Sequence, residues 1–112
     1  MQPKRIAQLA REAADAKLAV EPVILDLSRL TSFTHYFVIT HGNSDRHVRA
    51  IAQNIVEELE KDKVPLGHVE GMREGRWVLI DYGSTVIHVF YRDLREFYGL
   101  ERLWGSAPQV EN

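Results

Sequence analysis

The sequence contains no cysteine, no excess of basic residues and no long apolar run. Without cysteine the chain has no disulfide, no thiolate ligand for zinc or an iron–sulfur cluster, and no cysteine nucleophile. No stretch approaches the roughly 18 apolar residues of a membrane-spanning helix. The segment from Met1 to Arg5 lacks the apolar core of a signal peptide, and Glu12 and Asp15 argue against an organelle transit peptide. We therefore expect a cytoplasmic protein that does not span a membrane.

The charge balance is slightly acidic, with 14 Lys and Arg against 16 Asp and Glu and a formal net charge of −2. Nucleic-acid-binding domains neutralise phosphates and are usually basic. The balance therefore disfavours direct, sequence-specific nucleic-acid binding. A chain of 112 residues, 45% of them hydrophobic and 27% charged, has the composition of one globular domain. We expect this domain to cover residues 1–108 and a flexible tail to cover residues 109–112.

Apolar residues recur at helical spacing in two segments. The first covers residues 6–14, and Pro3 suits the first turn of that helix. The second covers residues 48–59, with Asn43 or Ser44 as its N-terminal cap, and it ends before Val64-Pro65.

Short apolar segments bounded by turn-forming residues are typical of β-strands. Three of them lie at residues 22–27, 36–40 and 66–69. A hairpin follows, in which residues 76–82 and 85–91 flank Gly83-Ser84. A two-residue turn with glycine first is the type II′ pattern.

This turn fixes which residues of the hairpin face each other. One face carries the pairs Val78–Val89 and Ile80–Ile87. Because these four side chains are apolar, we expect this face to lie in the core.

The other face of the hairpin mixes large apolar groups with an acid and a histidine. Its pairs are Trp77–Phe90, Leu79–His88 and Asp81–Val86. Two interpretations stay open. Either a second helical layer covers the face and makes Trp77 and Phe90 part of the core, or the face is a partner-binding patch rimmed by Asp81 and Glu70.

The chain closes with a short helix that begins with Asp93 and Glu96, which resemble a capping box. We expect Leu94, Phe97 and Tyr98 to pack inward and Gly99 to end the helix, with a further turn after it. The element order predicts an α/β (α+β) fold, with a mixed sheet of about five strands and helices packed on one or both faces.

The sequence contains few residue patterns that could carry catalysis. His41 and His47 lack the i, i+4 spacing of helical metal ligands, and no G-x-S-x-G motif is present. We predict no catalytic residue, metal site or cofactor. The alternative is a metal-dependent nucleotidyl or phosphoryl transferase that uses the Gly42–Ser44 loop and Asp81. That enzyme would lack the second carboxylate of its metal clamp.

Three ordered motifs carry a family resemblance over about residues 4–108. They are Thr34 to Ile39 with Gly42-Asn43-Ser44 and Arg46-His47-Val48; Glu70-Gly71 with Trp77 to Gly83; and Val86 to Phe90 with Arg92 to Glu101 and Leu103-Trp104-Gly105. Together they resemble the ribosomal silencing factors, the RsfS or Iojap family. The motifs show no departure from the family pattern, and the missing transit peptide favours a bacterial member.

The resemblance implies a function without chemistry. Members bind the large ribosomal subunit through ribosomal protein L14, block its association with the small subunit, and repress translation under nutrient limitation. The implied fold is nucleotidyltransferase-like without the catalytic cluster, and members self-associate as homodimers when free. The implied contact surface with L14 consists of Glu70, Gly71, Trp77, Asp81, Tyr82, Val86, His88 and Phe90.

Overall fold

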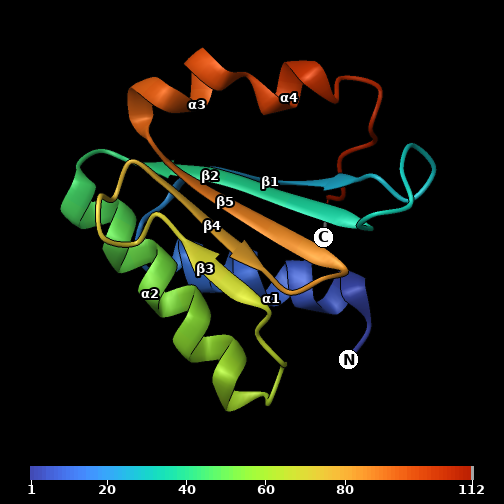
Figure 1. Ribbon diagram of the computed structural model, residues 1–112, viewed down its shortest axis with the longest axis horizontal. Helices are drawn as coiled ribbons and strands as arrows, with labels where there is room; N and C mark the ends of the chain where they lie inside the picture. Colours follow the sequence, from blue (N-terminus) through green and yellow to red (C-terminus); the bar gives the residue numbers. More distant parts are fainter. Residues whose placement is uncertain (112) are drawn as a thin grey trace.

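The computed structural model describes residues 1–111 as a mixed five-stranded sheet between two pairs of helices (Figure 1). The elements in chain order are α1 (Pro3–Asp15), β1 (Val20–Asp26), β2 (Tyr36–Gly42), α2 (Asp45–Lys61), β3 (His68–Glu70), β4 (Trp77–Asp81), β5 (Thr85–Tyr91), α3 (Arg92–Tyr98) and α4 (Leu100–Leu103). The predicted fold class is confirmed, and helices cover both faces of the sheet.

The strands lie in the order β1-β2-β5-β4-β3. β2 and β5 are parallel at the centre, and the other neighbours are antiparallel. The predicted hairpin register is confirmed, with Trp77 opposite Phe90 and Ile80 opposite Ile87. Gly83 has φ of +82°, the left-handed value that a leading turn glycine supplies at low cost.

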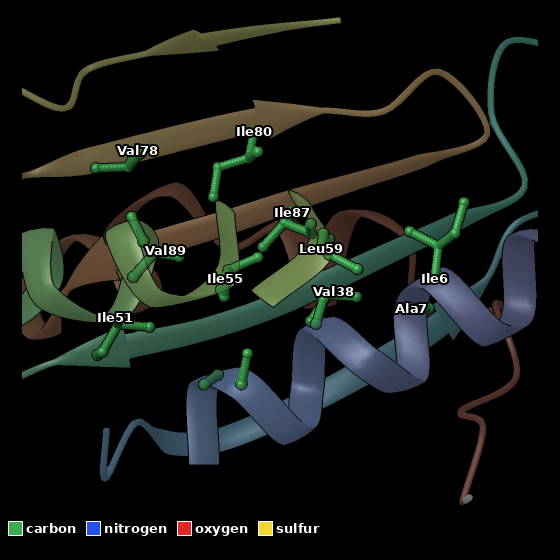
Figure 2. Close-up of a cluster of buried hydrophobic side chains, with 14 of the residues drawn as sticks. Ile6, Ala7, Val38, Ile51, Ile55, Leu59, Val78, Ile80, Ile87 and Val89 are labelled. Carbon is green, nitrogen blue, oxygen red and sulfur yellow. The ribbon is translucent and has the colours of Figure 1, made fainter. Parts of the chain in front are cut away.

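α1 and α2 cover the face that carries Ile80 and Ile87, and both side chains are fully buried. Ile51, Ile55 and Leu59 of α2 lie over the sheet in Figure 2 and belong to the same buried cluster as Ile80 and Ile87. Their spacing of four residues keeps them on one side of the helix. The predicted core face of the hairpin is therefore confirmed.

The start of α2 is held by side chains that the sequence places there. Ser44 Oγ accepts a hydrogen bond from His47 N–H at 3.0 Å, which confirms the predicted cap. His47 Nδ1 accepts from Asn43 N–H at 3.1 Å, so Nε2 carries the proton and donates to Lys17 O at 2.7 Å. His47 thus ties the loop before α2 to the end of α1.

α3 and α4 lie on the opposite face (Figure 1), where α3 packs over β5 and β2. Arg95 links α3 to α4 and to the sheet. Its guanidinium donates to the carboxylate of Glu101 in α4 at 2.8 and 3.1 Å. It also donates to Val20 O and Glu21 O, at 2.9 and 2.8 Å, where a bulge in edge strand β1 turns both carbonyls toward it. His41 Nδ1 accepts a further bond at 3.0 Å.

Two expectations for α3 are wrong. The helix begins at Arg92 after Tyr91, and no side chain caps it, so Asp93 and Glu96 form no capping box. Phe97 is 74% exposed instead of packing inward. The helix turns Leu94 and Tyr98 toward the sheet, which rotates Phe97 about 100° away from Tyr98 and into solvent.

The C-terminal segment is tied to the sheet where the sequence predicted a flexible tail. Gln109 forms an antiparallel bridge with Leu25, and Val110 N–H donates to Ile24 O at 2.9 Å. Arg11 of α1 donates to Val110 O at 3.0 Å. Edge strand β1 thus pairs its free side with these residues. The last residue, 112, lies outside the described residues, and the domain limit at 108 stays a prediction.

No helix within residues 1–111 is both long enough and apolar enough to cross a bilayer.

Candidate partner-binding surface

A hollow of about 300 Å³ opens on the α3 side of the sheet, where β4 and β5 extend beyond the helices. Its lining residues are Phe33, Phe37, His68, Glu70, Leu79, Asp81, Val86 and His88. We call it the β4 hollow. Strand alternation explains the lining, since Leu79 and His88 are cross-strand partners on the face away from the α2 core.

The rim of the β4 hollow carries two acidic side chains, of which Glu70 is exposed and Asp81 is half-buried. Glu70 Oε2 lies 2.8 Å from His68 Nε2, and Asp81 Oδ2 lies 3.8 Å from His68 Nδ1. Asp81 Oδ1 accepts a hydrogen bond from Gly83 N–H at 2.7 Å, which fixes the carboxylate beside the hairpin turn. The rim therefore places two carboxylates on either side of the His68 ring.

His88 lines the hollow as a buried and neutral ring. Only 4% of its surface is exposed. Burial lowers the pKa of His88 to about 4, so the ring is uncharged at neutral pH. Trp77 Nε1–H donates to His88 Nδ1 at 3.1 Å. The Phe37 and His88 rings form a T-shaped pair with a centroid distance of 4.5 Å.

Trp77 lies beside the hollow and is half-buried. Its ring centroid is 4.9 Å from that of Phe90 and 4.7 Å from that of Tyr98. Tyr98 is itself 47% exposed, so the two rings present a continuous aromatic surface at the edge of α3. Aromatic side chains in such positions are frequent anchors of protein interfaces.

The structure gathers five of the predicted contact residues on one surface and places three elsewhere. Glu70, Asp81, Val86 and His88 line the β4 hollow, and Trp77 adjoins it. The other three are Phe90, Tyr82 and Gly71.

Phe90 is fully buried beneath Trp77 and Tyr98, which corrects its expected place on an exposed patch. Tyr82 packs with the α2 core on the opposite face, where burial, followed by the Glu60 charge, raises its pKa to about 12. Gly71 has φ of +83°, and a Cβ there would lie 2.0 Å from Trp77 O. Its structural part is to allow the turn between β3 and β4.

The first interpretation, a covering helical layer, is only partly confirmed, and the partner-binding interpretation of this hairpin face stays a prediction. The helical layer covers Phe90 but leaves Trp77 and Leu79 half-exposed. Sequence reasoning missed Phe33 and Phe37 as walls of the hollow and Tyr98 as the neighbour of Trp77. No local pattern marks them, because Phe33 belongs to a loop and Phe37 to a strand that is distant in sequence.

The transferase alternative requires Asp81 beside the Gly42–Ser44 loop, and the structure separates them. Gly42 is opposite Tyr91 at one end of the central strands, whereas Asp81 pairs with Val86 near the other end. Val86 in turn pairs with Phe37, five residues before Gly42, a distance of about 16 Å along the strand. Within residues 1–111 no group of three or more His, Asp or Glu is arranged to hold a metal ion.

Comparison with known proteins gives one consistent family. Residues 1–112 match the family described as "Ribosomal silencing factor during starvation". The Bacillus subtilis protein named ribosomal silencing factor RsfS is 43% identical over 111 residues, which cover 99% of this chain and 94% of that protein.

Two solved structures resemble the fold closely. A crystal structure from Chromobacterium violaceum superposes with a TM-score of 0.91 at 35% identity. The match covers 94% of this chain and 88% of the chain from that organism. A crystal structure from Bacillus halodurans gives a TM-score of 0.85 at 38% identity, with coverage of 97% and 99%. On these matches the chain belongs to the ribosomal silencing factor (RsfS) family.

Proposed function

We propose that this protein binds the large ribosomal subunit through ribosomal protein L14 and thereby blocks joining of the small subunit. In the cytoplasm it would repress translation when nutrients are scarce. The observation that carries the proposal is the β4 hollow with Trp77 beside it, an apolar and aromatic surface that the helices leave open. Surfaces of this kind on a folded domain are typical of protein-binding sites.

The charge of this surface supports a protein partner on the ribosome. Glu70 and Asp81 give the hollow an acidic rim, which suits a basic ribosomal protein and repels the phosphates of ribosomal RNA. Complementary rim charges mainly accelerate association, whereas buried apolar contacts slow dissociation.

The proposed mechanism is steric and needs no catalytic group or cofactor. An ordinary interface covers about 800 Å² on each partner, a small part of the 6412 Å² surface of this chain. The molecule measures 34 × 33 × 23 Å. A body this thick on a subunit-joining surface keeps the other subunit out of contact range. We infer that the free protein self-associates as a homodimer.

Co-sedimentation with separated ribosomal subunits tests the proposal. The protein is expected to pellet with large subunits and not with small ones. Glu70→Lys should weaken this binding, because it reverses one charge of the hollow's rim. Glu57→Lys is the matched control, since it makes the same charge change on an exposed position of α2. Equal pelleting with both subunits, or with neither, would contradict the proposal.

A further inference from the structure

A second hollow, of about 420 Å³, lies between α3, α4 and the bulge of β1, at the end of the sheet where α3 begins (Figure 1). We call it the α3 hollow, and it shares no lining residue with the β4 hollow. All of its lining residues except the glycine have ionisable side chains; they are Glu21, His41, Arg92, Arg95, Glu96, Gly99, Glu101 and Arg102. Such a lining holds a ligand through charge-assisted hydrogen bonds.

Arg95 and Glu101 form the fixed base of the α3 hollow. The Arg95 side chain is only 10% exposed, and each of its five N–H groups already has an acceptor. Two bonds go to the Glu101 carboxylate, and the others go to Val20 O, Glu21 O and His41 Nδ1. Because this ion pair is saturated, recognition of a ligand falls to the other charges of the hollow.

These other charges are of both signs, and they are not paired with one another. Within residues 1–111, Arg102 makes no ion pair or hydrogen bond, and neither do the carboxylates of Glu21 and Glu96. Arg92 contacts only Asp93, at 3.3 Å, and both side chains are more than half exposed. A hollow with free positive and free negative groups is complementary to a small ligand that carries both charges.

Two backbone features hold the free charges around the hollow. Glu21 has φ of +42°, a left-handed value that a residue other than glycine adopts at a cost, and its exposed side chain gains no burial in return. Gly99 has φ of +59°, and a Cβ there would lie 2.5 Å from Arg102 Nη2, so glycine lets the guanidinium lie against the backbone. Strained backbone of this kind clusters at ligand-binding sites.

The signs of the charges restrict the class of ligand. A phosphate or a nucleotide would bring only negative charge toward the carboxylates of Glu21, Glu96 and Glu101, and a polyamine would bring only positive charge toward the arginines. A zwitterion meets groups of both signs. A volume of about 420 Å³ lies within the range of small-molecule sites, about 300–1,000 Å³.

We propose that the α3 hollow binds a free α-amino acid, with its carboxylate against Arg102 and its ammonium group against Glu21 and Glu96. This inference goes beyond the proposed function, because none of the predicted L14 contacts lines the α3 hollow.

A chemical-shift titration of the ¹⁵N-labelled full chain tests the inference. The probes are the standard L-amino acids, added one at a time, with acetate, methylammonium and inorganic phosphate as ligands that carry one kind of charge. We expect at least one amino acid to bind with a Kd of about 0.1–1 mM, as suits so small a ligand. It should shift the amide signals of Glu21, Glu96 and Arg102. Each singly charged probe should bind at least about tenfold more weakly, because it meets only half of the site.

Two neutralising variants test the assigned contacts. Arg102→Gln removes the partner of the ligand carboxylate, and Glu21→Gln removes a partner of the ammonium group, so each should weaken amino-acid binding about tenfold. Arg46→Gln and Glu60→Gln are the matched controls, because they make the same changes at exposed positions of α2 on the other side of the sheet. Both controls should bind like the wild type. The amide spectrum of each variant shows that it is folded.

Three results would overturn the inference. The first is that no amino acid gives a saturable shift at the α3 hollow. The second is that acetate or phosphate binds as tightly as the best amino acid, which would make the hollow a simple anion site. The third is that Arg102→Gln and Glu21→Gln both bind like the wild type, which would place the ligand elsewhere. None of these results bears on the proposed function, which is decided by binding to ribosomal subunits.

Discussion

Replacing Ile80 by alanine should destabilise the domain far more than replacing its neighbour Leu79. Ile80 is fully buried between Ile87 and the helices of the α2 face, whereas Leu79 points the other way and is half-exposed in the β4 hollow. The change removes three carbon groups, worth about 0.8 kcal/mol each on transfer from water, and leaves a cavity. Buried isoleucine-to-alanine changes cost about 2–5 kcal/mol, so we expect about 3 kcal/mol here. That is a large share of a typical stability of about 5–15 kcal/mol.

Urea melts followed by circular dichroism measure this effect. With a slope near 1.5 kcal/mol per molar urea, Ile80→Ala should lower the midpoint by about 2 M. Leu79→Ala should lower it by about half as much or less, and should weaken L14 binding instead. Equal midpoints for the two variants would refute the assignment of the two hairpin faces.

Three further predictions follow from named contacts. Leu18 is 81% exposed with φ of +59°, so Leu18→Gly should raise the free energy of unfolding by about 0.5 kcal/mol in urea melts, whereas Leu18→Ala should not. Arg95→Met should cost about 3 kcal/mol in the same assay, because it leaves the Glu101 carboxylate and Glu21 O without their donor and removes one of the two donors to Val20 O. In an NMR titration it should also raise the pKa of His41, which burial and then the Arg95 charge hold low. Because the pKa of His88 falls from 6.5 to about 4 on folding, the unfolded chain takes up the proton first. Stability should therefore be complete above about pH 6.5 and decline toward pH 4 by on the order of 3 kcal/mol, and His88→Gln should remove this slope.

Much of the fold could be predicted because its signals are local. The turn at Gly83 and the alternation of the hairpin determine the register through residues no more than 13 positions apart, as for Trp77 and Phe90. The stripe from Val48 to Leu59 and the Ser44 cap likewise define α2 from neighbouring residues.

The rest depends on contacts between distant segments. Phe90 and Trp77 are cross-strand partners with similar sequence surroundings, and only the placement of α3 buries one and leaves the other half-exposed. That placement follows from Arg95 meeting the β1 bulge, more than 70 positions away in the chain. The pairing of Gln109 with Leu25 is equally remote and has no local signature.

A subunit-joining assay measures the proposed steric block itself. Purified large subunits are incubated with the protein, small subunits are added, and joining is followed by light scattering. We expect the wild type to suppress joining in proportion to its occupancy of the large subunit, Glu70→Lys to suppress it less, and Glu57→Lys to act like the wild type. Undiminished joining with large subunits saturated by the protein would rule out the steric block.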